Sequence, residues 1–263
     1  MSGKIVALLT RHCGILLISA CILAQTARGA EDDDRGYFWP STLMEPAWGL
    51  ENDSADFFGT GEFEEDSGDD PTAKIGLRYA RGLAKGFGLR AHAQLIRFNS
   101  GDYTAWGAAE TELGLRWKAV QGEKFRPTLQ LKGDLYIPTG GMSATDWAAS
   151  GGLNLSWKKN NWGFHLNGLY TGGEGSHGSI GVSEVDRWRV AAGSSYRFMR
   201  SGGDLTFAFV GAQPTRSKPN EWSFEVATRI PLFHRLVGTM GVAAPLRDAG
   251  IDWIIRFGLG FEF

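Results

Sequence analysis

One glycine-rich stretch of the sequence brings together the residue types of a hydrolase. The segment Gly175-Ser-His-Gly-Ser179 places His177 between two serines, and Glu174, Glu184 and Asp186 lie nearby. Histidine can act as a general base for a serine hydroxyl when a carboxylate orients its ring. Such a triad is recognised by geometry and not by closeness in sequence, and Ser, His and Gly are ordinary residues of a flexible loop. We therefore expect no catalytic residue here and keep a hydrolase with a loop site near His177 as an alternative.

Charged and polar residues also recur at every second position of apolar segments. At the C-terminal end, Arg256 alternates with Ile255, Phe257 and Leu259. Successive side chains of a β-strand point to opposite faces, so the polar set shares one face. In a closed barrel that face lines the lumen, where charged side chains set which ions pass. The residues that we predict to line a pore on this basis are Lys74, Arg78, Arg90, His92, Glu112, Arg116, Lys118, Lys132, Asp134, His165, Arg187, Arg189, Arg197, Glu225, Arg229 and Arg256.

Bases outnumber acids on this predicted inner face, even with Glu62, Glu64, Glu110 and Glu262 included. A barrel of about 12 strands has a backbone cylinder on the order of 24 Å across, which long side chains would narrow. The lumen is then either closed by ion pairs that cross it or open as a basic path for anions. Because so many charges need water, we favour a narrow, partly plugged and weakly anion-selective channel.

The histidines outside the loop have plainer interpretations. His92 and His165 fall on the inner face, where we favour a hydrogen-bonded structural role. His234 falls in a short turn. The acidic runs at 32–34 and 64–70 lack the spacing of an EF-hand, so we expect no metal site and interpret them as solvated runs. No phosphate-binding or dinucleotide-binding motif is present, and we expect no cofactor.

Short strands must position the inner-face residues. From about residue 55 the sequence alternates in segments of roughly ten residues, which is typical of membrane barrels. Aromatic residues such as Trp253 and Phe263 mark the two ends of the apolar face, as interfacial girdles do. This predicts an all-β fold, a transmembrane antiparallel up-and-down β-barrel of about 12 strands. The predicted strands are 55–65, 73–80, 87–98, 109–120, 127–138, 146–157, 162–170, 187–198, 204–212, 221–231, 236–244 and 252–263.

The connections between these segments alternate in length. The short ones, at 81–86, 121–126, 158–161, 199–203 and 232–235, are predicted to be periplasmic turns. The other set, including 99–108 and 171–186, is predicted to be extracellular loops.

The N-terminal residues have the parts of a secretory signal peptide. Lys4 and Arg11 precede the apolar run 14–24, and the small-residue site Ala27-Arg28-Gly29 follows it. We expect residues 1–29 to be removed, so that neither cysteine of the sequence remains in the exported chain. No later apolar run approaches the ~18 residues of a membrane-spanning helix.

A second interpretation of this region stays open. Ile18-Ser19-Ala20-Cys21 resembles a lipoprotein box, at which the chain would be cut before Cys21 and acylated there. We favour the signal peptide without acylation, because Ile22-Leu23-Ala24 continue the apolar run.

Charge is distributed unevenly along the exported chain. Arg35 is the only base within residues 31–70, which are rich in Asp and Glu, whereas residues 71–263 are net basic. We divide the chain into an acidic periplasmic leader or plug at 30–54 and an outer-membrane barrel at 55–263. The leader is either a mobile tail or a soft plug at the mouth of the barrel.

Two motifs carry resemblances to known proteins. The end of the chain resembles the outer-membrane insertion signal, polar-x-Gly-x-x-aromatic-x-aromatic, with matches at Arg256, Gly258, Phe261 and Phe263. Residues 73–263 resemble the meta-pathway phenol-degradation family of outer-membrane barrels. The segments that carry this likeness are Leu131-Lys-Gly-Asp-Leu-Tyr-Ile-Pro-Thr-Gly140, Asp146-Trp147 and Tyr170-Thr-Gly-Gly-Glu174.

The family resemblance implies a transporter-like channel for small aromatic or apolar compounds. Together with the basic inner face, it leads us to expect a porin-like protein of the cell outer membrane of a Gram-negative bacterium, for passive passage of small aromatic or anionic solutes. The expected partners are outer-membrane lipid and lipopolysaccharide, the barrel-assembly machinery and a small-molecule solute, with no nucleic acid. A closed structural barrel without transport is a further alternative to the hydrolase.

Overall fold

The computed structural model describes most of the predicted barrel. The described residues are 54–63, 72–84, 86–100, 103–122, 126–141, 147–172, 188–199, 203–213, 220–233, 235–246 and 253–262. The predictions that concern the signal peptide, the leader, the loop around His177, Arg187, His234 and Phe263 lie outside these residues.

The described residues form twelve β-strands. Their bounds are β1 (Ser54–Phe63), β2 (Thr72–Ala84), β3 (Phe87–Ser100), β4 (Tyr103–Val120), β5 (Thr128–Ile137), β6 (Ala148–Lys159), β7 (Trp162–Gly172), β8 (Trp188–Arg197), β9 (Asp204–Gln213), β10 (Glu221–Phe233), β11 (Leu236–Pro245) and β12 (Trp253–Glu262).

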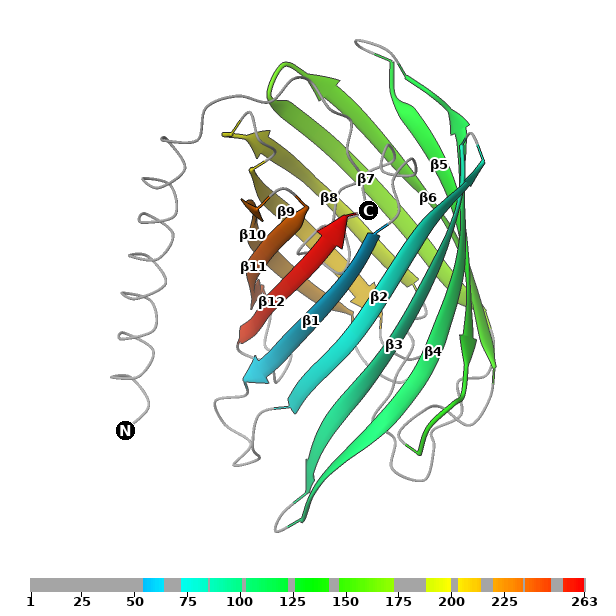
Figure 1. The fold of residues 1–263 in the computed structure, drawn as a ribbon, viewed down its shortest axis with the longest axis vertical. Coiled ribbons are helices and arrows are strands. Elements are labelled where there is room, and N and C mark those ends of the chain that lie inside the picture. The colour runs from blue at the N-terminus through cyan, green and yellow to red at the C-terminus, as the bar shows by residue number, and fades with distance from the viewer. Residues whose placement is uncertain are drawn as a thin grey trace, which may run out of the picture.

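Each strand pairs antiparallel with its neighbours in sequence, and β1 pairs with β12. In Figure 1, β12 (red) lies beside β1 (blue) and closes the sheet into a barrel. Closure leaves no strand edge with unpaired backbone N–H and C=O groups. A sheet that lies in lipid must close in this way, because lipid offers these groups no hydrogen bonds. The predicted all-β, antiparallel up-and-down barrel is therefore confirmed.

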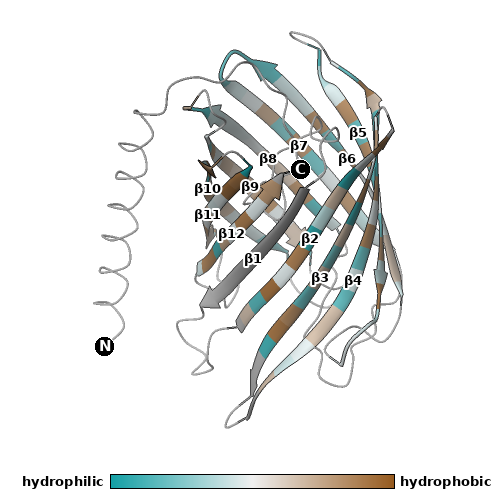
Figure 2. Ribbon diagram, viewed as in Figure 1, coloured by the Kyte–Doolittle hydropathy of each residue, from teal (hydrophilic) through white to brown (hydrophobic). Residues whose placement is uncertain are grey.

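The two faces of the sheet are inverted relative to a soluble protein. Apolar side chains such as Leu115 and Phe257 are about half exposed, at 49% and 56%, on the outer face. Polar side chains such as Asn154 and His165 are buried, at 0% and 1% exposure, on the inner face. Figure 2 shows the same alternation as teal and brown bands along β2, β3 and β4. Among the described residues, no helix is long and apolar enough to cross a membrane.

One predicted loop is wrong. Residues 99–108 were expected to form an extracellular loop, but β3 continues to Ser100 and β4 begins at Tyr103. The register shifts here, since Ala93 pairs with Thr111 whereas Leu95 pairs with Ala108. The extra β4 residue of this bulge changes which face the side chains take, so the regular alternation is interrupted inside a continuous strand.

The ends of the barrel differ in their connections. The end at which β1 starts and β12 finishes, here called the short-turn end, also holds the turns β2–β3, β4–β5, β6–β7, β8–β9 and β10–β11. Two of these turns contain a left-handed residue, Gly86 with φ 81° and Asn160 with φ 55°. Glycine and asparagine are the residues that tolerate this conformation, which allows strands to be joined by very few residues.

Candidate pore-lining site

The described members of the predicted pore-lining set share the inner face of the barrel. Each is buried or half-buried, whereas neighbours in the same strands, such as Leu77, Leu131 and Val190, are exposed on the outer face. Strand alternation therefore places these side chains on the inner face. Their role in lining a pore and setting its selectivity stays a prediction.

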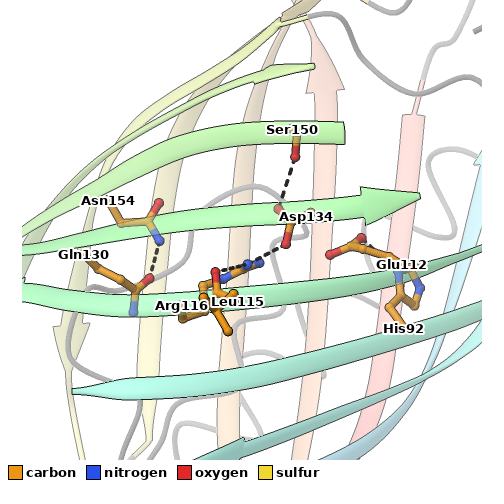
Figure 3. Close-up of polar contacts among 8 residues, drawn as sticks. All are labelled: His92, Glu112, Leu115, Arg116, Gln130, Asp134, Ser150 and Asn154. Atoms are coloured by element: carbon orange, nitrogen blue, oxygen red, sulfur yellow. Dashed lines mark hydrogen bonds and ion pairs between the residues drawn. The ribbon is translucent and has the colours of Figure 1, made fainter. Parts of the chain in front are cut away.

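A close ion pair of the inner face joins β4 and β5. Arg116 Nη1 lies 2.5 Å from Asp134 Oδ1, and each side chain is 3% exposed. Ser150 on β6 donates its hydroxyl to Asp134 Oδ2 over 3.3 Å. Gly114 lies beneath this pair, because a Cβ there would collide with Asp134 Oδ1 and lie 2.8 Å from Arg116 Nη1. Figure 3 shows these contacts crossing the inner surface of the sheet.

A second charged group lies beside the first. His92 Nδ1 on β3 is 3.4 Å from Glu112 Oε2 on β4, and the two side chains are 17% and 16% exposed. The positive charges of Arg90 and Arg116 also act on the Glu112 carboxylate. The register places Arg78 directly opposite His92. Basic groups of β3 and β4 therefore surround one carboxylate (Figure 3 shows His92 and Glu112).

The next part of the inner face is polar but uncharged. Asn154 on β6 donates its amide N–H to Gln130 Oε1 on β5 over 2.7 Å. His165 on β7 is fully buried, with Ser156 Oγ 3.0 Å from Nδ1 and Ser195 Oγ 3.1 Å from Nε2. A neutral imidazole has one donor and one acceptor nitrogen, so one serine donates to the ring and the other accepts from it. Hydrogen bonds thus fix the ring of His165 to the wall.

An ion pair on the opposite part of the barrel spans three strands. Arg256 Nη1 on β12 lies 2.7 Å from Glu225 Oε1 on β10. The guanidinium reaches across β11, whose inward residues there are Gly241 and Ala243. Small residues at these positions leave room for the long arginine side chain.

A further charged group lies at the short-turn end. Asp204, the first residue of β9, lies opposite Arg197 on β8 and opposite Arg229 on β10. Arg197 Nε is 3.4 Å from Oδ1, and Arg229 Nη1 is 3.9 Å from Oδ2. One carboxylate is thus shared by two guanidinium groups.

The predicted pore-lining set omits two ionisable inward residues, Asp204 and Tyr136, and the uncharged inward residues Ser150, Gln130, Asn154, Ser156 and Ser195. Asp204 was left out because it begins a strand whose inner face is otherwise uncharged, although the outward residues Leu205, Phe207 and Phe209 place it inward. Tyr136 was left out because aromatic residues were assigned to the lipid-facing side. The register places it opposite Glu112. Both lie within the predicted strands 127–138 and 204–212, so the alternation applied to every residue of these strands would have found both.

The inner face carries charged and hydrogen-bonding groups that are held in place by one another. Within the described ranges, no group of three or more His, Cys, Asp or Glu residues is arranged to hold a metal ion. The hydrolase alternative concerns the loop around His177, which lies outside the described ranges. What the described geometry offers is a wall of fixed arginine, carboxylate, amide and hydroxyl groups.

The predicted assembly signal falls on β12. Phe261 is 43% exposed on the outer face, and Gly258 and Arg256 lie on the inner face. Phe263 lies outside the described residues.

Comparisons with known proteins identify the fold. No protein-family model and no curated protein matches the sequence. Among solved structures, the COG4313 outer membrane channel from Pseudomonas putida F1 is similar at a TM-score of 0.59 and 12% identity, covering 89% of this chain and 100% of that one. The KdgM porin in complex with disordered oligogalacturonate is similar at a TM-score of 0.58 and 12% identity, covering 80% and 99%. The NanC porin is similar at a TM-score of 0.57 and 12% identity, covering 80% and 100%.

These likenesses are too distant in sequence to carry more than the fold, and they do not show the phenol-degradation family. They agree with the fold of the described strands, a closed antiparallel barrel with an apolar outer face and a polar inner face. The protein is accordingly an outer-membrane β-barrel.

Proposed function

We propose that the protein is a narrow, porin-like channel that lets small solutes pass the outer membrane and that it is weakly selective for anions. The observation that carries the proposal is the inner face, where basic side chains outnumber acidic ones among the described residues. The bases are Lys74, Arg78, Arg90, Arg116, Lys118, Lys132, Arg189, Arg197, Arg229 and Arg256, and the acids are Glu110, Glu112, Asp134, Asp204, Glu221 and Glu225.

Two further points support a channel. The similar solved structures are a channel and two porins by name. Charged side chains at the inner face of a membrane barrel also need water, since the burial of many charges in a dry interior is very costly. Ion pairs such as Arg116–Asp134 keep these side chains against the wall.

The solute class follows from charge and from the family resemblance. A basic path favours small anions. The resemblance to the phenol-degradation family adds aromatic compounds. Small aromatic acids have both a negative charge and an aromatic ring, so we propose them as solutes. We propose passive passage, with the residues of the predicted pore-lining set determining selectivity.

Single-channel recording tests the proposal. The purified full-length protein in a planar bilayer should conduct. In a KCl gradient its reversal potential should be shifted towards the equilibrium potential of chloride. Small aromatic carboxylates added to one side should carry current or reduce the chloride current. A folded barrel that does not conduct would instead favour the closed structural barrel.

The orientation and assembly proposals have their own test. We propose that the short-turn end faces the periplasm and that Arg256, Gly258, Phe261 and Phe263 form the signal that the barrel-assembly machinery recognises in a membrane of lipid and lipopolysaccharide. Deletion of Phe263 should lower the amount of heat-modifiable barrel in the outer membrane, whereas Leu246→Ala, at an exposed residue beyond β11, should not. Equal amounts of the Phe263 deletion and the wild-type protein would contradict the signal.

A further inference from the structure

Three arginine-bound carboxylates of the described strands differ in how closely the guanidinium approaches. Asp134 and Glu225 each have one such contact, at 2.5 Å and 2.7 Å. Charge-assisted N–H···O hydrogen bonds are ordinarily about 2.7–2.9 Å. Asp204 instead has two contacts, at 3.4 Å and 3.9 Å. The Asp204 carboxylate is therefore held loosely between two guanidinium groups.

The backbone fixes this arrangement. Arg197, Asp204 and Arg229 lie directly opposite one another on β8, β9 and β10. Thr228 donates its hydroxyl to the carbonyl oxygen of Asp204 over 3.2 Å, which ties the start of β9 to β10. The positive charge of Lys158 on β6 also acts on the carboxylate. Basic groups from three strands therefore converge on one acid at the short-turn end.

The polar atoms of the cluster are placed to accept another ligand. The side chains of Asp204 and Arg229 are 7% and 6% exposed, and that of Arg197 is 21% exposed. Among the described residues, Asp204 Oδ2 accepts no hydrogen bond. A guanidinium presents its donors as a fork that matches carboxylate and phosphate oxygens. Two such forks that share one loosely held carboxylate can turn towards a second oxyanion.

We propose that Arg197 and Arg229 form an oxyanion-binding site at the short-turn end of the lumen and that Asp204 is a tethered competitor which limits its affinity. The ligand class is a small carboxylate or phosphate that takes the place of the Asp204 carboxylate against the two arginines. Conduction requires a site that binds well enough to admit an ion and weakly enough to release it. Asp204 supplies the weakening, so it sets the affinity of the site without being the main contact to the solute.

This inference rests on the proposed channel for its role, but binding can be measured without conduction. The probe is inorganic phosphate, titrated by calorimetry into the detergent-solubilised full-length protein. Asp204→Asn keeps the size of the side chain and removes the competing charge. Because a unit charge at about 4 Å contributes about 1–4 kcal/mol at or near a protein surface, the Kd for phosphate should fall at least about fivefold.

Glu225→Gln is the matched control. It removes the same charge from the same lumen, at a carboxylate that the structure shows bound at 2.7 Å by Arg256. An effect of net charge alone would raise the phosphate affinity of both variants, whereas an effect of the Arg197–Asp204–Arg229 cluster would raise it only in Asp204→Asn. Equal phosphate affinities of the two variants would overturn the proposal.

A second variant keeps the test decisive if Asp204→Asn does not fold. Arg197→Gln removes the more exposed guanidinium and leaves Asp204 beside Arg229. Phosphate should bind the wild-type protein, and Arg197→Gln should weaken that binding several-fold. Absence of phosphate binding to the wild-type protein, or unchanged binding in Arg197→Gln, would overturn the site. A barrel that binds phosphate as expected but never conducts would overturn the channel and leave the site standing.

Discussion

Two glycines on the inner face leave space for polar contacts that a larger residue would displace. A Cβ at Gly114 would collide with the Arg116–Asp134 pair, and a Cβ at Gly163 would lie 2.6 Å from Ser195 Oγ and 2.9 Å from His165 Nε2. In both cases the obstructing atoms are the ends of side chains and not backbone. The absence of a side chain at these positions therefore allows a specific contact to form above the strand.

Gly114→Ala should destabilise the barrel through this effect. The added methyl group forces Asp134 and Arg116 apart, and the two side chains are each only 3% exposed. Loss of a contact between buried charged groups costs roughly 1–3 kcal/mol in the free energy of unfolding. Urea unfolding in lipid vesicles measures the change.

The control for that substitution is Gly151→Ala on β6, where an added Cβ meets no atom within 4 Å. It changes the same residue type within a strand of the same barrel. If Gly114→Ala and Gly151→Ala unfold at the same urea concentration, the ion pair does not depend on Gly114.

At the scale of the strand, alternation determines which side chains face lipid. In β12, Phe257 and Leu259 are exposed at 56% and 50%, whereas Arg256 between strands β11 and β1 is buried at 8%. This strand was predictable from its sequence because its alternation is uninterrupted from Trp253 to Phe261.

The same rule explains where sequence reasoning failed. In β4, Trp106 and Trp117 are both exposed on the outer face although one number is even and the other odd. A bulge between them, at Ala109 and Glu110, shifts the alternation by one residue. Two regular halves with opposite phase do not look like one strand, so the first half was taken for a loop. The position of such a bulge depends on which residues of the neighbouring strand pair with it, and a single sequence does not show these pairings.

The pairings within the inner face were likewise beyond the sequence. Alternation places Arg256 and Glu225 on one face, but their contact across β11 depends on the closed register of three strands. The shared carboxylate of Asp204 depends on the register of β8, β9 and β10 in the same way.

Charges placed on the two faces of β12 should have unequal effects. Leu259→Arg puts a guanidinium on the outer face, where an arginine at the middle of the bilayer costs about 2–4 kcal/mol and less towards its surface. Gly258→Arg puts it on the inner face, beside Thr239, where water can hydrate it. Reversible unfolding in vesicles should therefore show the larger loss for Leu259→Arg. Equal losses would contradict the assignment of faces.

At the scale of the whole molecule, charge is divided between the barrel and the residues before it. The inner face of the described strands is net basic, and the sequence before β1 is strongly acidic between residues 31 and 53. Tyr37, Phe38, Trp39 and Trp48 lie within the same segment. β1 begins at the short-turn end, so the acidic segment is joined to the barrel at that mouth of the lumen. An acidic segment tethered at a basic mouth has a high local concentration there.

We therefore predict that residues 31–53 act as a soft plug. Charge alone would hold the segment weakly, since physiological salt screens it over ~8–10 Å, and the aromatic residues supply contacts that salt does not screen. Deletion of residues 31–53 should raise the open probability and shift selectivity further towards anions. The control keeps the full length and replaces Asp32, Asp33 and Asp34 by Asn, which separates charge from bulk. Planar-bilayer recordings at low and high salt make the measurement. If the shortened barrel conducts and selects like the full-length protein at both salt concentrations, the segment is a tail that does not reach the pore.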